Sequence, residues 1–108
     1  MKMIFAIVRP EKLKDVTTVL DSKGFSSLTE MSVRGRGKQR GIHIGNMIYD
    51  KLPKEMVIIV CQNKDYEEII KIVIETAQTG NIGDGKIFVV DVGEEYTIRT
   101  GEKSKEDV

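Results

Sequence analysis

The sequence has no tryptophan, a single cysteine and a single histidine. Cys61 has no second cysteine for an intrachain disulfide, and together with His43 it cannot supply the four ligands of a structural zinc ion. The absence of disulfides is typical of a reducing compartment. Apolar runs are also short: Pro10 interrupts the first one too early for a secretory signal, and none reaches transmembrane length. We therefore expect a cytoplasmic protein without a structural zinc site.

The chain also lacks an excess of charge of either sign, since its 108 residues carry 17 Lys and Arg and 17 Asp and Glu. No overall field therefore attracts nucleic acid or an anionic membrane. Three phenylalanines and three tyrosines, with no aromatic signature on a strand, disfavour an RNA-binding module. No nucleophile–base pair or carboxylate dyad is visible either. We expect one non-enzymatic domain, residues 1–108, and keep the RNA-binding module as the alternative from another class.

Hydrophobic periodicity predicts two strand–helix–strand units in succession. Pro10 suits the first turn of the first helix, Gly24 its C-terminal end, and Asn63 the cap of the second. The order matches the ferredoxin-like (split βαβ) fold, an α+β arrangement, βαββαβ, in which four antiparallel strands carry both helices on one face. The expected strands are 3–8, 25–34, 55–61 and 86–92, and the expected helices span 10–23 and 64–77.

One face of the predicted sheet has no cover. Thr29, Met31 and Val33 share one side of the second strand, and the other strands are almost wholly apolar. Exposed hydrophobic surface of this extent usually marks an assembly, so we expect a homo-oligomer with its sheets turned inward. A short strand at 96–99 and a frayed end from residue 102 complete the expected C-terminal loop and tail, 93–108.

Residues 35–54 break the periodicity. They hold four glycines and a basic cluster formed by Arg36, Lys38 and Arg40. Loops of this length in a small domain are usually functional or disordered, so we expect a long, mobile loop here. Its basic side chains either approach a polyphosphate or are simply solvated. Gln39, in the same loop, is a candidate contact for a polar ligand or a metal.

Residues 79–86, Thr-Gly-Asn-Ile-Gly-Asp-Gly-Lys, contain three glycines and a lysine. Backbone N–H groups that glycine turns inward, together with one lysine, can form an anion cradle. The segment is not a Walker A loop, because Ile87 stands where Ser or Thr is needed and a helix precedes it. The negative end of that helix disfavours phosphate, so a polyphosphate here needs further cations, such as Arg99. Asp84 is a second candidate for a polar ligand or metal. The alternative is a simple turn, with Gly80 as the glycine after the helix cap.

With these motifs in view, the chain resembles the PII nitrogen-regulatory signalling proteins over almost its whole length. The string T-G-N-I-G-D-G-K-I-F-V, residues 79–89, is long and specific, and segments 1–13, 35–41, 52–54 and 98–101 also match. Segments 35–39, 41–42 and 45–46 resemble the archaeal nitrogenase-associated subgroup.

The resemblance implies a trimer with nucleotide sites in the clefts between subunits, where ATP and ADP compete. It further implies that 2-oxoglutarate binds beside Mg-ATP, where Gln39 supports the Mg²⁺ ion and Lys54 pairs with a carboxylate of the ketoacid. The nucleotide-binding residues it implies are Ile7 and Thr29 near the base, the backbone of Val60, Gly83, Asp84, Gly85 and Lys86 in the turn, Gly35, Gly37 and Lys38 near the phosphates, and Arg99 from the adjoining subunit.

The function implied is a nitrogen-regulatory sensor that binds ATP or ADP and 2-oxoglutarate and controls nitrogenase through the shape of the 35–54 loop. Members of the subgroup act with a second PII-like paralogue, so a hetero-oligomer is implied as well. The rival within the family is regulation of an ammonium channel, which would bring the protein to a membrane indirectly, or of glutamine synthetase. Thr97 replaces a second phosphate-binding arginine of many relatives, and the loop lacks the tyrosine-bearing segment that is uridylylated in others.

Overall fold

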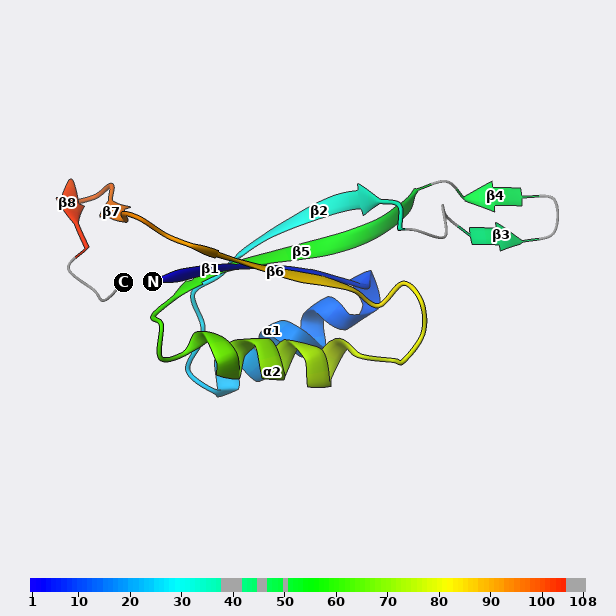
Figure 1. Ribbon diagram of the computed structural model, residues 1–108, viewed down its shortest axis with the longest axis horizontal. Coiled ribbons are helices and arrows are strands. Elements are labelled where there is room, and N and C mark those ends of the chain that lie inside the picture. The colour runs from blue at the N-terminus through cyan, green and yellow to red at the C-terminus, as the bar shows by residue number, and fades with distance from the viewer. Residues whose placement is uncertain (38–41, 45–46, 50, 105–108) are drawn as a thin grey trace.

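The computed structural model describes residues 1–37, 42–44, 47–49 and 51–104. Four strands, β2, β5, β1 and β6, lie in that order in one antiparallel sheet, and both α-helices cover the same face (Figure 1). The predicted ferredoxin-like α+β fold is confirmed. The elements are β1 (Lys2–Val8), η1 (Pro10–Lys12), α1 (Leu13–Ser22), β2 (Thr29–Gly35), β3 (Ile42–Ile44), β4 (Met47–Tyr49), β5 (Leu52–Cys61), α2 (Tyr66–Ala77), β6 (Gly85–Asp91), β7 (Tyr96–Thr97) and β8 (Glu102–Lys103).

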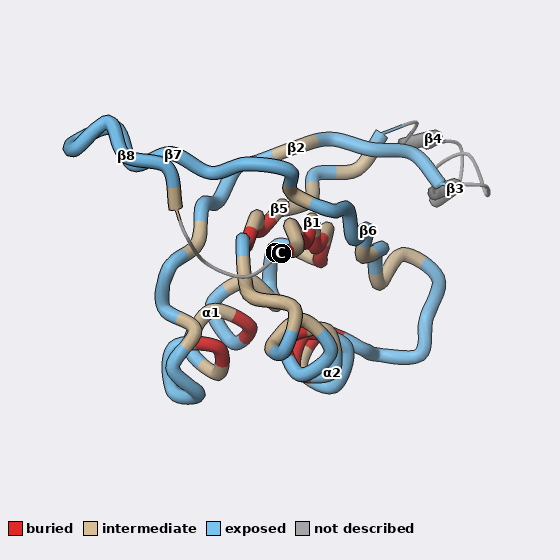
Figure 2. The backbone as a smooth tube through the Cα atoms, turned by 60° about the vertical axis from the view of Figure 1, so that its left-hand side comes forward, coloured by how far each residue is buried: buried red, intermediate tan, exposed pale blue. Residues whose placement is uncertain are grey.

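The core lies between the sheet and the helices, where Figure 2 places the buried residues. In a strand, successive side chains point to opposite faces. Ile4, Ala6 and Val8 of β1 and Val57 and Ile59 of β5 are buried against the helices for this reason. The helices contribute Val16, Leu20, Ile69, Ile72, Val73 and Ala77.

Both helices begin in ways the sequence only partly predicts. Pro10 opens a single 3₁₀ turn that leads into α1, and Gly24 follows the helix with φ +90°, as expected. Asn63 does not cap α2. Its side-chain oxygen accepts a hydrogen bond from the N-terminal ammonium of Met1 (2.9 Å), and Asp65 stands at the N-cap instead. No helix in the described part of the chain is long and apolar enough to cross a bilayer.

Two strands of the main sheet begin more than one residue away from the predicted start. β2 begins at Thr29 rather than at residue 25, because Phe25 and Leu28 pack against the core. β5 begins at Leu52 and runs through Pro53. The proline is tolerated because β1 ends its pairing with β5 at Glu55, so this part of β5 pairs only with β2.

Two short hairpins include residues for which a long loop or a frayed end was expected. β3 pairs with β4 inside the expected loop 35–54, with Ile44 opposite Met47. β7 is shorter than the strand expected at 96–99, and it pairs with β8, at residues where a frayed end was predicted. In both cases a short β-forming stretch finds its partner only a few residues away.

The face of the sheet away from the helices is apolar and open. Thr29, Ile58, Phe5 and Phe88 stand opposite one another across four strands, so they share this face. Phe88 is 52% exposed, and Met31 and Val90 on the same face are 48% and 45% exposed. A surface of this kind is typical of an interface between subunits, in agreement with the trimer that the resemblance implies.

Candidate functional site

One carboxylate closes the loop between α2 and β6. α2 ends at Ala77, and Asp84 reaches back to accept hydrogen bonds from the backbone N–H groups of Thr79 (2.8 Å) and Gly80 (2.9 Å) and from the Thr79 hydroxyl. The bonds from Thr79 do most to hold the pKa of the Asp84 carboxyl well below its usual range, and Arg9 contributes. The carboxylate is therefore ionised and engaged within the protein, and its contact with a ligand or metal stays a prediction.

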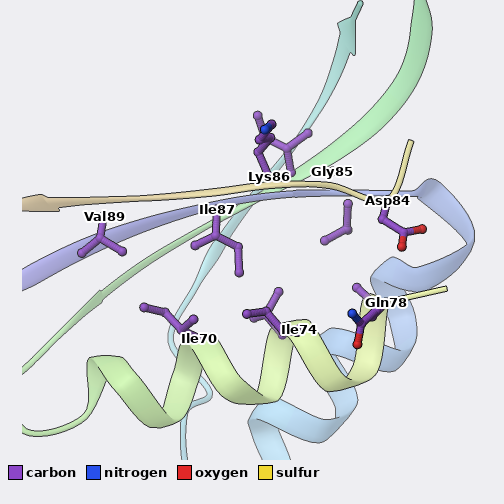
Figure 3. A pocket seen from close by; sticks show the side chains of 12 residues that line it. Ile70, Ile74, Gln78, Asp84, Gly85, Lys86, Ile87 and Val89 are labelled. Atoms are coloured by element: carbon purple, nitrogen blue, oxygen red, sulfur yellow. The ribbon is translucent and has the colours of Figure 1, made fainter. Parts of the chain in front are cut away.

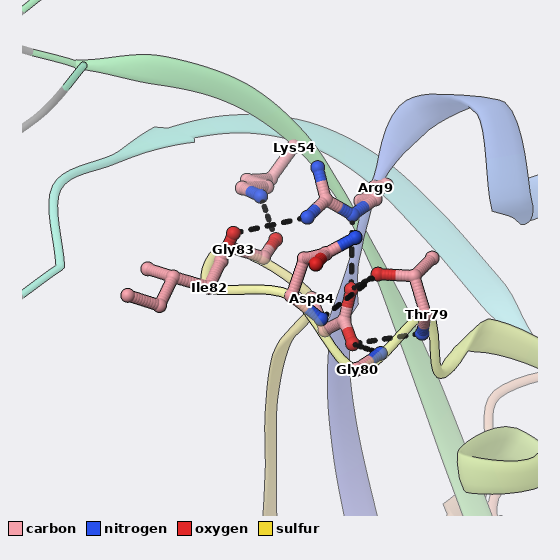
Figure 4. Close-up of polar contacts among 8 residues, drawn as sticks. Arg9, Lys54, Thr79, Gly80, Ile82, Gly83 and Asp84 are labelled. Carbon is pink, nitrogen blue, oxygen red and sulfur yellow. Dashed lines mark hydrogen bonds and ion pairs between the residues drawn. The ribbon is translucent and has the colours of Figure 1, made fainter. Parts of the chain in front are cut away.

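Two cations from other parts of the chain hold the next residues of this loop (Figure 4). Arg9, directly after β1, donates from Nε to Asp84 (3.0 Å) and from Nη2 to the Ile82 carbonyl (3.0 Å). Lys54 of β5 donates from Nζ to the Gly83 carbonyl. Partial burial, together with the nearby Arg9, lowers the pKa of the Lys54 ammonium. Residues 82–84 are thus the point where the ends of β1 and β6 meet β5.

Close approaches explain two of the glycines. Gly85 has φ +115°, and a Cβ there would lie 1.8 Å from the carbonyl oxygen of Ile7. Gly83 has φ +102°, and a Cβ there would lie 3.3 Å from Arg9 Nη2. Only glycine satisfies both conditions at Gly85, since the obstructing atom belongs to the backbone. Gly80 has φ +87° with open space around it, but α2 ends too early for it to be the residue directly after the cap.

A cleft of about 490 Å³ lies beside this loop, between it and the neighbouring ends of β2 and β5. Arg36, Lys54 and Lys86 line the cleft. Among the described lining residues the one acidic group is the carboxylate of Asp84, and it is paired with Arg9. Glycine backbone and excess positive charge suit an anionic ligand. The cleft brings together eight of the predicted site residues: Ile7, Gly35, Gly37, Lys54, Gly83, Asp84, Gly85 and Lys86.

Six of the seven predicted site residues that lie on strands belong to the open face of the sheet, and the seventh, Gly85, pairs with Val8 of the buried face. The register places Ile7 opposite Lys86. Gly35 is an even number of residues from Thr29 on β2, so both belong to the same face of the sheet. These residues belong to the open face, because each either pairs with a residue of that face or lies two, four or six residues from one along its strand. The six residues are Ile7, Thr29, Gly35, Lys54, Val60 and Lys86.

Three described residues of the predicted site do not line the cleft. Thr29 and Val60 lie further along the open face, opposite Ile58 and Met3 respectively. Arg99 lies between β7 and β8, at the opposite end of the molecule from the loop 79–85 (Figure 1). The remaining two, Lys38 and Gln39, lie outside the described residues, and Gln39 was also the predicted metal contact. In the described part, no three His, Cys, Asp or Glu side chains are grouped to hold a metal ion.

Arg9 was not among the site residues predicted from the sequence. A signal was available. In the ferredoxin-like topology the first and last strands are antiparallel neighbours, and the register pairs Val8 with Gly85. A cation that follows the first strand therefore meets the loop that precedes the last strand.

A second hollow, of about 480 Å³, lies on the other side of β6, between that strand and α2 (Figure 3). Ile70, Ile74 and Val89 make most of its wall apolar. Lys86 points away from it, toward the open face of the sheet. We therefore interpret this hollow as a gap at the edge of the core, where α2 does not fully cover β6. Apart from the loop residues that it shares with the cleft, its described wall offers little that suits an anion.

Comparison with known proteins agrees with this arrangement. The family model "Nitrogen regulatory protein P-II" matches residues 1–102. The chain belongs to the P-II family. P-II proteins are trimeric regulators of nitrogen metabolism rather than enzymes, and the family generally binds ATP or ADP and 2-oxoglutarate.

Relatives of this P-II chain match nearly end to end. A "Nitrogen fixation nifHD region GlnB-like protein 1" of Methanobacterium ivanovii is 52% identical over 103 residues, which cover 95% of this chain and 98% of the relative. The protein of the same name from Methanothermobacter marburgensis is 48% identical with the same coverage. "Nitrogen regulatory protein P-II 2" of Methanothermobacter thermautotrophicus is 44% identical over 112 residues, covering 100% of this chain and 97% of the relative. The resemblance to archaeal nitrogen-fixation members of the family is confirmed.

Proposed function

We propose that this P-II protein is a non-enzymatic cytoplasmic sensor that binds ATP or ADP and 2-oxoglutarate and controls nitrogenase. The observation that carries the proposal is the cleft, where eight residues from four separate segments converge on a glycine-rich loop with three cations. The names of the relatives, which place them in a nitrogen-fixation gene region, favour nitrogenase over an ammonium channel or glutamine synthetase.

The polyphosphate would lie against the backbone of Gly83 and Gly85, with Lys86 and the 35–39 segment around it. Ile7 and the open face beyond it supply an apolar surface for the base, toward Thr29 and Val60. Because α2 directs its negative end at this loop, the charge must be balanced by cations from elsewhere. Lys54 and Arg36 supply two of them within the chain.

A further cation would come from a second copy. Arg99 is too far from the cleft of its own chain to contact a ligand there, since it lies at the other end of the sheet. The exposed apolar face can bury itself only against other subunits, and a trimer built on this face would place the β7–β8 hairpin of one subunit beside the cleft of the next. The site is therefore completed by the homotrimer, or by a hetero-oligomer with a second P-II-like paralogue.

The ketoacid would pair with Lys54. Its ammonium group has three donors, and among the described residues it donates one hydrogen bond, to the Gly83 carbonyl, which leaves two donors for a carboxylate. Gln39 would support the Mg²⁺ ion that joins the ketoacid to ATP. Since 2-oxoglutarate would bind one conformation of the 35–54 segment more tightly and nitrogenase the other, each would lower the apparent affinity for its competitor.

Calorimetry with purified protein tests this scheme. We expect 2-oxoglutarate to bind only in the presence of Mg-ATP, and Lys54→Ala to abolish that binding while ATP still binds. Lys71→Ala, which removes an exposed lysine from α2, is the matched control and should bind both ligands as the wild type does. Ketoacid binding that is indifferent to ATP would contradict the scheme.

The partner and the rival classes are tested separately. Pull-down of nitrogenase should succeed without 2-oxoglutarate and fail with it. Sustained turnover of ATP would show an enzyme, and RNA binding with a steep salt dependence would show the alternative module.

A further inference from the structure

We propose that Arg9 is a positioning residue of the site: through its ion pair with Asp84 it sets the shape of the loop 79–85 and, with it, the place of the Lys54 ammonium. The effect of Arg9 on the loop is inferred from contacts within the chain. Its consequence for ligand binding rests on the proposed function.

Arg9 contacts the loop 79–85 at two places, one of which is the carboxylate that closes it. Asp84 closes the loop by accepting three hydrogen bonds from Thr79 and Gly80, and Arg9 is its partner from outside the loop. Nη2 of the same guanidinium binds the Ile82 carbonyl. One side chain thus fixes both a carboxylate and a carbonyl two residues apart, which the planar fork of arginine can do and a lysine ammonium on a flexible stem does less well.

Peptide geometry carries the effect to Lys54. The peptide bond is planar and trans, so fixing the direction of the Ile82 carbonyl also fixes the N–H of Gly83 on the other side of that plane. Asp84, held by the same arginine, bounds Gly83 from the other side. The Gly83 carbonyl, which accepts from Lys54, is therefore oriented by residues on both sides of it.

Charge supports the same conclusion. Arg9 lies close enough to lower the pKa of the Lys54 ammonium, while Asp84 acts on it in the opposite direction. With Asp84 paired to Arg9, two cations can approach three successive loop residues without a large mutual repulsion. Loss of Asp84 would leave Arg9 uncompensated beside Lys54, so the pair acts as a unit.

The test compares Arg9→Gln, Asp84→Asn and the double variant, with Arg9→Lys as the conservative change. Lys2→Gln is the matched control: it removes the ion pair with Asp91, which joins β1 and β6 at the opposite end of the same strand pair. The first readout needs no ligand. Hydrogen exchange of the Thr79 and Gly80 amides, measured by NMR, reports directly on the loop that Asp84 closes.

We expect Arg9→Gln to speed this exchange by roughly twofold to fivefold, because a partly exposed ion pair contributes on that scale. The double variant should add little to Asp84→Asn, since both changes remove the same interaction. Arg9→Lys should recover part of the protection, and Lys2→Gln should leave it unchanged. Equal exchange in Arg9→Gln and Lys2→Gln, or full additivity in the double variant, overturns the proposal.

The second readout is the affinity for 2-oxoglutarate at saturating Mg-ATP. A weakening of roughly tenfold in Arg9→Gln, partly restored in Arg9→Lys, is expected. An unchanged affinity beside accelerated exchange overturns the link to Lys54. If the wild type itself binds no ketoacid, the proposed function fails, while the exchange data still decide whether Arg9 positions the loop.

Discussion

Replacing Gly85 by alanine should destabilise the protein more than the same change at Gly80 or Gly93. The new Cβ would lie 1.8 Å from the carbonyl oxygen of Ile7 and 2.8 Å from its carbon, both backbone atoms, so the ends of β1 and β6 must separate. The overpacking costs about 1–3 kcal/mol, and the φ of +115° adds about 1–3 kcal/mol of strain. We therefore expect a loss of roughly 2–6 kcal/mol from a total stability on the order of 5–15 kcal/mol.

Alanine substitutions at two further glycines distinguish the cost of backbone strain from the cost of steric overlap. Gly80→Ala combines φ +87° with open space, so only the strain of about 1–2 kcal/mol is expected. Gly93→Ala has neither a positive φ nor a neighbour within 4 Å, and should stay within about 0.5 kcal/mol of the wild type.

Urea unfolding followed by far-ultraviolet circular dichroism measures the series, since the chain has no tryptophan to report by fluorescence. All variants must be compared at one protomer concentration, because assembly stabilises the folded subunit. A Gly85→Ala midpoint equal to that of Gly93→Ala would refute the reasoning.

Three other changes test the site and the open face. The pKa of Asp84 is lower in the folded than in the unfolded protein, so its contribution to stability is present above an ordinary carboxyl pKa of about 4 and is lost as the pH falls toward the lowered folded value. Asp84→Asn should therefore make the free energy of unfolding, measured by urea titration, less dependent on pH in this acid range. Because burial and Arg9 lower the pKa of Lys54, affinity for 2-oxoglutarate should fall as the pH rises above that lowered value, measured by calorimetry, with proton uptake on binding. Phe88→Asp places a charge on the exposed apolar face and should shift the trimer toward monomer in sedimentation velocity, while an unchanged assembly would show that this face is not the interface.

The order of strands and helices could be predicted because the periodicities are clear and each helix stripe faces one core. The strand bounds were less predictable, because local sequence patterns conflict with the tertiary packing. Phe25 continues the alternation of β2 but packs beneath the sheet, and Pro53 reads as the end of a strand although β5 continues through it. The hairpin of β3 and β4 had a signal, since two β-forming triplets flank Gly45 and Asn46, but the surrounding glycines concealed it.

The candidate site divides in the same way. The glycine string and its lysine stand together in the sequence, and the structure places them in one cleft with Ile7 and Lys54, the residues that the resemblance groups with them. Asp84 bonds Thr79 and Gly80 only four or five residues away, but its pairing with Arg9 is a tertiary contact over 75 residues, which no local pattern contains.

The distance between Arg99 and the cleft of its own chain has a genetic consequence. If each ligand site is shared by neighbours, a chain carrying Arg99→Ala still offers a sound cleft, and a chain carrying Lys86→Ala still offers a sound arginine. Two alleles that are each inactive would then complement one another when expressed together, through the mixed particles they form. Rescue by co-expression would be impossible for a sensor whose binding groups all came from one polypeptide.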